Sequence, residues 1–165
     1  MTAWRIIGSP LGALTLGARD GKLAALHFGA QGGEAESADP VLTETERQLA
    51  AYFAGRLKAF DLPLLLEGSD FQLAVWEAMR RIPYGFTRNY GEIARETGAP
   101  ARAVGAACGS NPIVIVVPCH RVVGADGSLT GFSGGEGVET KARLQRHEQA
   151  VPLSDQLSLF ARPSR

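Results

Sequence analysis

The chain has 165 residues, of which 45% are hydrophobic and 21% are charged, enough for a buried core in one domain or in two small ones. The 17 basic and 17 acidic side chains balance, so net charge alone indicates neither a nucleic-acid nor a membrane partner. No apolar run approaches the ~20 residues that cross a membrane, and residues 1–5 do not resemble a signal peptide. We therefore expect a cytoplasmic protein without membrane contact.

The first 40 residues predict strands followed by a loop. Residues 3–28 alternate short apolar runs with turn residues, and Asp20-Gly21 between two of these runs is a hairpin signal. Residues 29–40 are rich in Gly, Ala and acidic side chains, which is typical of a loop.

A helix and a linker complete the N-terminal region. Thr43 and Glu46 have the spacing of a capping box, which predicts a helix from there to Gly55. Residues 56–68 are typical of a short strand and a linker. We place the domain boundary in this segment, which leaves an N-terminal α/β domain at residues 1–68.

Residues 69–149 predict a second, mainly helical domain. Ser69 and Gln72 repeat the capping-box spacing ahead of apolar residues at helical intervals. Two short helices at 91–97 and 101–108, joined by a turn that contains glycine, have the proportions of a helix-turn-helix.

An apolar run, a loop and a last helix follow. Residues 113–117 form an apolar run too short for a free-standing helix, which predicts a buried extended segment. Residues 124–137 are a glycine-rich loop, residues 138–149 a helix, and residues 150–165 a tail.

Cys119 and His120 stand directly after the apolar run. An imidazole that takes the thiol proton makes a cysteine nucleophilic. Neighbouring side chains on an extended segment point apart, however, and a buried structural cysteine beside a partly exposed histidine is the commoner arrangement. Cys108 is expected to be structural. Two cysteines without a secretion signal predict neither a disulfide nor a zinc site, and no metal or organic cofactor is indicated.

The residues around this pair resemble a known family. Pro118-Cys119-His120-Arg121-Val122 is similar to the active-site signature of the O6-alkylguanine-DNA alkyltransferases, the methylated-DNA–protein-cysteine methyltransferases. Five further segments have the family's order and spacing: Ile82-Pro83-Tyr84-Gly85, Tyr90-Gly91-Glu92-Ile93-Ala94, Ala101-Arg102-Ala103-Val104-Gly105, Asn111-Pro112 and Gly131-Phe132-Ser133-Gly134-Gly135. The resemblance is continuous over residues 70–148 and fainter through the N-terminal strands.

The resemblance implies an α/β fold and a DNA-repair activity. The fold joins a small ribonuclease-H-like N-terminal α/β domain to a mainly helical, winged-helix-like C-terminal DNA-binding domain. The activity is a single, suicidal turnover that moves the alkyl group of O6-alkylguanine in double-stranded DNA onto Cys119, without a cofactor or metal. O4-alkylthymine is a second candidate substrate. A monomer is expected, with self-association on DNA as the alternative.

The resemblance also implies catalytic roles. Cys119 accepts the alkyl group, and His120 is the base that acts through a bridging water. Glu148 orients and charges the imidazole, in the logic of the hydrolase triads. Asn111 hydrogen-bonds around the thiolate, and Tyr90 lies beside the flipped base and helps to protonate the leaving guanine.

The binding roles follow from the same source. The main chain at Cys119 and Val122 accepts from the guanine amino group, Ser133 donates near O6, and Gly134 belongs to the same substrate loop. Arg102 fills the space that the flipped base leaves, with its helix in the minor groove.

Each implied role has an ordinary structural alternative. Tyr90 could belong to the core or cap a helix, and Arg102 could be solvated. Asn111 before a proline is typical of a turn. Glu148 near a helix end would usually lie at the surface, and His147 beside it complicates the assignment.

Three other functions compete with alkyl transfer. An alkyltransferase-like protein that binds lesions without chemistry commonly carries tryptophan in place of the acceptor, whereas Cys119 is present here. A thiol hydrolase or redox protein would need a hydrolysable intermediate or a CxxC pair, and the latter is absent. A helix-turn-helix regulator would not need Cys119.

Overall fold

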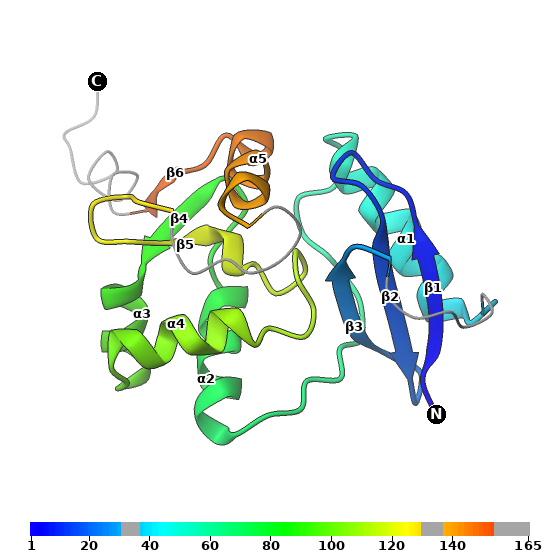
Figure 1. The fold of residues 1–165 in the computed structure, drawn as a ribbon, viewed down its shortest axis with the longest axis horizontal. Coiled ribbons are helices and arrows are strands. Elements are labelled where there is room, and N and C mark those ends of the chain that lie inside the picture. Colours follow the sequence, from blue (N-terminus) through cyan, green and yellow to red (C-terminus); the bar gives the residue numbers. More distant parts are fainter. Residues whose placement is uncertain (31–36, 130–136, 154–165) are drawn as a thin grey trace, which may run out of the picture.

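The computed structural model describes residues 1–30, 37–129 and 137–153, which form two lobes joined by one extended segment (Figure 1). One lobe holds a sheet covered by a helix, and the other packs helices around a second, small sheet. Within the described ranges, no helix is long and apolar enough to cross a membrane.

The N-terminal lobe is an antiparallel sheet with one helix against it (Figure 1). Its strands β1 (Ala3–Ile7), β2 (Leu14–Arg19) and β3 (Lys22–Phe28) lie in the order β1-β2-β3, so the strand and hairpin predictions are confirmed. Asp20 and Gly21 make the hairpin turn with φ of 54° and 73°, the left-handed conformation that such turns require.

Helix α1 (Pro40–Phe53) begins earlier than predicted. Asp39 is its N-cap, and its carboxylate accepts a hydrogen bond from the Val41 N–H at 2.9 Å. Proline fits the first helical position because its φ is preset and it has no N–H to satisfy. The capping box predicted at Thr43 is therefore wrong, and that residue lies within the first turn.

The segment 56–68 contains no strand of its own. The Leu23 N–H donates to the Pro63 carbonyl at 2.8 Å, and the Leu65 N–H donates to the Leu23 carbonyl at 2.9 Å. These bonds make one isolated parallel bridge between Leu23 and Leu64. The short strand predicted here is wrong because a proline has no N–H with which to extend the ladder.

Helix α2 (Asp70–Arg80) starts as the sequence predicts. The Ser69 hydroxyl accepts from the Gln72 N–H at 3.1 Å, and the Gln72 side chain accepts from the Ser69 N–H at 2.9 Å. This reciprocal pair satisfies two otherwise unpaired donors and confirms the predicted capping box.

Helices α3 (Tyr90–Thr97) and α4 (Ala101–Gly109) form the predicted helix-turn-helix. Helix α3 begins one residue earlier than expected because Asn89 and Glu92 make a second capping box, with bonds of 2.8 and 2.9 Å. Gly98 ends the helix in the left-handed conformation at φ 77°, which glycine adopts without strain.

The second sheet was not predicted. Strands β4 (Phe86–Asn89), β5 (Val122–Val123) and β6 (Val151–Pro152) pair in parallel in the order β5-β4-β6, beside helix α5 (Val138–Glu148). Two of the strands are two residues long, too short for an alternating pattern to show. The residues of β6 belong to this sheet, although the sequence analysis assigned them to a tail.

The apolar segment 113–117 is buried, but it is not extended. The Val117 N–H donates to the Ile113 carbonyl at 2.9 Å, closing a turn in which Ile115 has φ 72°. A β-branched residue rarely adopts this conformation. The prediction of an extended segment is therefore wrong, because apolar composition signals burial and does not reveal a turn. The turn leads directly to Cys119.

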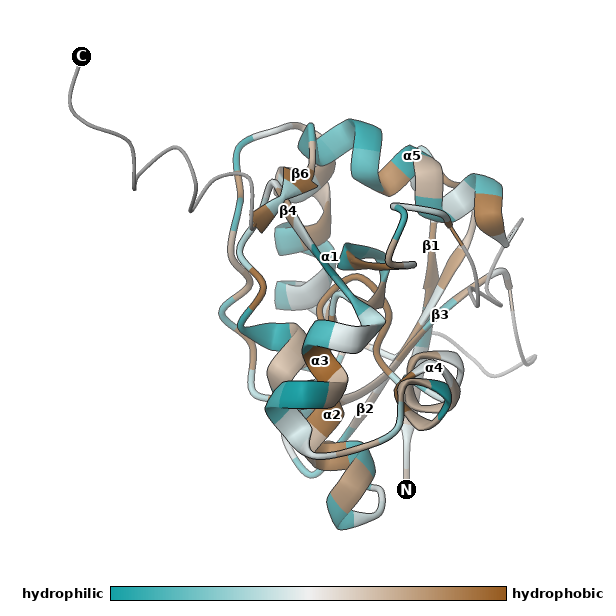
Figure 2. Ribbon diagram, turned by 90° about the vertical axis from the view of Figure 1, so that its left-hand side faces the viewer, coloured by the Kyte–Doolittle hydropathy of each residue, from teal (hydrophilic) through white to brown (hydrophobic). Residues whose placement is uncertain are grey.

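Helices α2 and α4 are joined through the core of the C-terminal lobe. Trp76 of α2 is 2% exposed, and its indole N–H donates to the Ala107 carbonyl of α4 at 2.9 Å. Figure 2 shows that many residues of α2 are hydrophobic, whereas most residues of α5 are hydrophilic. The helix-turn-helix is thus anchored to the same core that surrounds Cys119.

Candidate active site

Cys119 begins a single 3₁₀ turn, η1 (Cys119–Arg121), and its side chain is buried. Asn111 points at it: the amide Nδ2 donates to the Cys119 Sγ at 3.2 Å and to the Val117 carbonyl at 2.7 Å. The amide oxygen accepts from the Ile113 N–H at 3.0 Å. One buried amide therefore holds the turn together and directs a donor at the sulfur.

The Cys119 thiol is protonated at rest. Burial raises its pKa, while the hydrogen bond from Asn111 and the nearby charge of Lys141 act in the opposite direction. A thiol is a strong nucleophile only as the thiolate. The site therefore needs a base that takes the proton during the reaction.

The imidazole of His120 has one ring nitrogen that can accept a proton. Its side chain is fully buried, and its Nε2 lies 2.8 Å from the Glu148 Oε2. A carboxylate can only accept, so Nε2 carries the hydrogen and Nδ1 carries a lone pair. Nδ1 is buried and has no hydrogen-bond partner among the residues that the structure describes. The imidazole is thus arranged to receive a proton at Nδ1.

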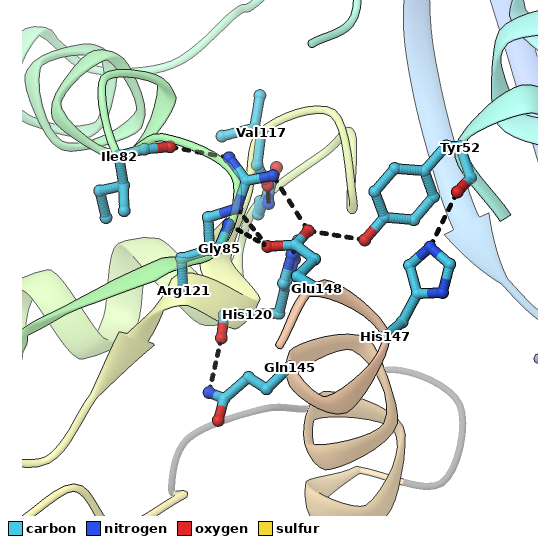
Figure 3. Close-up of polar contacts among 10 residues, drawn as sticks. Tyr52, Ile82, Gly85, Val117, His120, Arg121, Gln145, His147 and Glu148 are labelled. Atoms are coloured by element: carbon cyan, nitrogen blue, oxygen red, sulfur yellow. Dashed lines mark hydrogen bonds and ion pairs between the residues drawn. The ribbon is translucent and has the colours of Figure 1, made fainter. Parts of the chain in front are cut away.

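Glu148, the last residue of α5, is the centre of the network (Figure 3). Arg121 donates to both carboxylate oxygens, with Nε 2.9 Å from Oε1 and an Nη 3.0 Å from Oε2. The Tyr52 hydroxyl donates to Oε2 at 2.6 Å. Bidentate, charge-assisted pairs of this kind hold both orientation and charge. We refer to Asn111, Cys119, His120, Arg121, Glu148 and Tyr52 as the polar cluster.

The charges of the polar cluster are balanced. Burial alone would raise the pKa of Glu148, but its bonds to His120 and Arg121 hold that pKa well below the usual range, so the carboxylate is ionised. Burial lowers the pKa of His120, against the pull of Glu148 and with a contribution from the Arg121 charge. At pH 7 the imidazole is therefore neutral and able to act as a base.

Lys141 brings Tyr90 and the second thiol into the same region. It is 1% exposed on α5, with Nζ 3.4 Å from the Tyr90 hydroxyl and 5.6 Å from the centre of that ring. Burial lowers the pKa of Lys141, and the thiols Cys108 and Cys119 counter this effect. Burial also raises the pKa of Cys108 to about 12.

The structure places the residues that the sequence indicated in different ways. Cys119, His120, Asn111 and Glu148 meet in the polar cluster, and Tyr90 adjoins it through Lys141. Of the binding residues, Val122 is buried in β5 with its N–H bonded to the Cys119 carbonyl, whereas Arg102 is exposed on the first turn of α4. The other two lie outside the described residues: Ser133 and Gly134.

The choice between His147 and Glu148 is resolved by their contacts. Glu148 is 3% exposed inside the polar cluster, so the surface alternative for it is wrong. His147 instead turns its Nε2 to the Tyr52 carbonyl at 2.8 Å (Figure 3). Adjacent positions on a helix point about 100° apart, so only one of the two can enter the site.

Sequence reasoning missed three members of this region. Arg121 lies inside the recognised signature, and only its bonds reveal its part. Lys141 shares a helix face with Leu144 and Glu148 at spacings of three and four, a pattern that could have been noticed. Tyr52 lies 96 residues before Glu148 in another domain, and no local signal connects them.

Within residues 1–30, 37–129 and 137–153, no three His, Cys, Asp or Glu side chains gather in a set that could hold a metal ion. The polar cluster brings together a thiol, an imidazole and a carboxylate, the groups of nucleophilic catalysis.

Comparison with known proteins covers both lobes. The family description "6-O-methylguanine DNA methyltransferase, DNA binding domain" matches residues 70–150, and "6-O-methylguanine DNA methyltransferase, ribonuclease-like domain" matches residues 3–66. A methylated-DNA–protein-cysteine methyltransferase of Mycolicibacterium paratuberculosis is 49% identical over 93% of this chain and 98% of its own length.

Solved structures agree with this assignment. The crystal structure of the Mycobacterium tuberculosis O6-methylguanine methyltransferase matches with a TM-score of 0.81 and 46% identity, covering 97% of this chain and 99% of that one. The crystal structure of Mycobacterium tuberculosis OGT in complex with DNA matches with a TM-score of 0.79 and 51% identity, covering 89% and 92%. The chain belongs to the family of the methylated-DNA–protein-cysteine methyltransferases.

Proposed function

We propose that this chain repairs O6-alkylguanine in double-stranded DNA by moving the alkyl group onto its own Cys119, once per molecule. One observation carries the proposal: a buried thiol receives a hydrogen bond from Asn111 at 3.2 Å and is followed directly by a buried His120–Glu148 pair. The family relatives carry the same activity in their names.

The first step is formation of the thiolate. Cys119 gives its proton through a bridging water to the Nδ1 of His120, which becomes an imidazolium. Glu148 stabilises that cation from the Nε2 side at 2.8 Å, and Asn111 stabilises the negative sulfur. The Nδ1 of His120 supports this route, because it is buried and has no hydrogen-bond partner within the described residues.

The second step is alkyl transfer. The Cys119 sulfur attacks the alkyl carbon; an S–C bond forms, the C–O6 bond breaks, and the electron pair stays on guanine. Tyr90 supplies a proton to the leaving base. The product is a thioether, which water does not hydrolyse, so the protein is consumed with each lesion repaired. O4-alkylthymine would react by the same displacement at its own O–alkyl bond.

Recognition requires the base to leave the stack, since the target atom is out of reach inside a duplex. Helix α4 enters the minor groove, and Arg102, exposed on its first turn, fills the space that the base leaves. Main-chain oxygens of Cys119 and Val122 accept from the guanine amino group. Ser133 donates near O6 from the loop that includes Gly134.

The chain would act as a cytoplasmic monomer with two units. Residues 1–68 form a supporting α/β domain, and residues 69–149 carry the helix-turn-helix and the acceptor, with β6 (Val151–Pro152) added to the second unit. The family matches at 3–66 and 70–150 support this division. Self-association would be confined to DNA, where neighbouring molecules meet.

Mass spectrometry tests the function. The protein is incubated with a duplex that contains one O6-methylguanine, and its intact mass and peptides are measured. A single methyl group on Cys119, with guanine restored and no second turnover, is the expected result. Unmodified protein that still binds the lesion would favour a non-catalytic alkyltransferase-like protein, and a methyl group on Cys108 would identify a different acceptor.

A further inference from the structure

The polar cluster includes one side chain from the N-terminal lobe, Tyr52 of α1. Its hydroxyl lies 2.6 Å from the Glu148 Oε2, the same oxygen that accepts from His120 (Figure 3). The residue is fully buried, and burial together with the neighbouring carboxylate raises its pKa. The phenol is therefore a permanent donor over the whole working pH range.

Tyr52 is held at both of its polar ends by consecutive residues of α5. Glu148 accepts from its hydroxyl at 2.6 Å, while His147 pairs with its main-chain carbonyl at 2.8 Å. Its ring packs edge-on against Phe53 at 5.1 Å and against Tyr84 at 6.0 Å between centroids. These contacts leave the hydroxyl a single position, directed at the carboxylate.

The Tyr52 hydroxyl binds the carboxylate oxygen that also pairs with His120, so it reduces the negative charge that stabilises an imidazolium. Three donors share Oε2: the Tyr52 hydroxyl, the His120 Nε2 and the Arg121 guanidinium. A carboxylate that accepts a further hydrogen bond attracts a proton on its neighbour less strongly. Without the phenol, Glu148 would hold an imidazolium more tightly, and His120 would keep its proton to a higher pH.

We propose that Tyr52 is a positioning residue through which the N-terminal lobe sets the basicity of the Glu148–His120 pair and keeps His120 a neutral proton acceptor. The consequence for rate rests on the proposed function, since it needs His120 to take the Cys119 proton. The consequence for His120 itself does not, and it can be measured without DNA.

The other titratable or charged groups that face the pair come from η1, from α5 and from the turn before β4. Arg121 and Cys119 belong to η1, Lys141 lies on α5, and Tyr84 lies in the turn. All of them stay in place when only one hydroxyl is removed. A change in His120 on losing that hydroxyl is therefore attributable to Tyr52.

The test compares Tyr52→Phe with Tyr84→Phe. Both changes keep a ring of the same aromatic cluster and remove one hydroxyl, and that of Tyr84 has no hydrogen-bond partner in the described part of the chain. Because the chain has three histidines, nitrogen NMR can follow the His120 imidazole through a pH titration of the folded protein.

In Tyr52→Phe we expect the pKa of His120 to rise by about 0.5 to 1 unit, with no change in Tyr84→Phe. The acid limb of the methyl-transfer rate should move up by the same amount. An unaltered His120 titration in folded Tyr52→Phe would overturn the proposal.

A second variant covers the case in which Tyr52→Phe does not fold. 3-Fluorotyrosine encoded at position 52 keeps ring and hydroxyl but donates more strongly, so the His120 titration and the acid limb should move to lower pH. No movement overturns the proposal. Absence of methyl transfer in the unchanged protein would instead count against the proposed function, and the NMR titration would still decide the role of Tyr52.

Discussion

The end of α4 and the turn after residue 117 each place a cysteine in the interior, and the two surroundings differ. Cys108 is 7% exposed and Cys119 2%, and burial raises the pKa of both thiols. Within residues 1–30, 37–129 and 137–153, Cys119 is the one thiol that receives a side-chain hydrogen bond, from Asn111, and the one that adjoins a histidine paired with a carboxylate. Burial alone thus makes a thiol inert, and the polar groups around Cys119 provide what reactivity requires.

The largest expected effect comes from exchanging the thiols themselves. Cys119→Ser should lower methyl transfer by several orders of magnitude, since a hydroxyl is a far weaker nucleophile, and removal of a nucleophile has effects of that size. Cys108→Ser should leave the rate within about twofold, because within the described residues the histidine–carboxylate pair adjoins Cys119 and not Cys108. Transfer of radiolabelled methyl from duplex DNA measures both. Retained transfer in Cys119→Ser would show that the two surroundings have been assigned the wrong way round.

Breaking the carboxylate of the polar cluster should have the next largest effect. Glu148→Gln leaves Arg121 buried without its counter-ion and His120 without its stabilising charge. We expect the transfer rate to fall about 10²- to 10⁴-fold, and the free energy of unfolding to fall by about 3–5 kcal/mol. Single-turnover kinetics and urea unfolding provide the two values.

The same helix offers a matched control. Glu139 pairs with Arg146 at 3.1 Å, with more than half of each side chain exposed. Glu139→Gln should change the free energy of unfolding by no more than about 0.5 kcal/mol, since water screens such a pair. If Glu148→Gln and Glu139→Gln lower the free energy of unfolding by the same amount, the buried network does not set the environment of Cys119.

Asn111→Ala should have a smaller effect, because it leaves the base intact. It removes the donor to the Cys119 sulfur, and hydrogen bonds to charged groups are worth enough to predict a rate lower by about 10- to 100-fold. Ser110→Ala, one position earlier, removes a hydroxyl that bonds to Ala107 and Gln72 instead, and the rate should not change. Equal rates in the two variants would mean that the amide only shapes the turn.

How much the sequence predicts differs between these regions. The signature around Cys119, the Ser69 capping box and the helix-turn-helix are local patterns, so the sequence alone predicts them. The Tyr52–Glu148 bond joins residues that lie 96 positions apart, and the left-handed conformation of Ile115 has no signal in a run of apolar residues. Apolar periodicity predicts which residues are buried, but it carries no information on which buried polar atoms meet.

The two thiols should also differ in how their reaction rates depend on pH. The pKa of His120 is lowered from its ordinary value of 6.5 by burial, so the base is neutral above that value and becomes protonated only below it. The rate of methyl transfer should therefore be level from about pH 7 to 8 and fall about tenfold per unit once the pH drops below the folded pKa. Stability should fall in the same direction, because the unfolded chain binds the proton first as the pH drops below 6.5.

Cys108 should respond to pH in the opposite way. With its pKa near 12, only the rare thiolate reacts, so its labelling by iodoacetamide should rise about tenfold per unit through pH 9. Peptide mapping at each pH separates it from Cys119. If methyl transfer to Cys119 also rose without a plateau, its thiol would ionise without help from His120. A level profile beside the steep one would instead show that a neighbouring base, and not the acidity of the sulfur, makes one buried cysteine reactive.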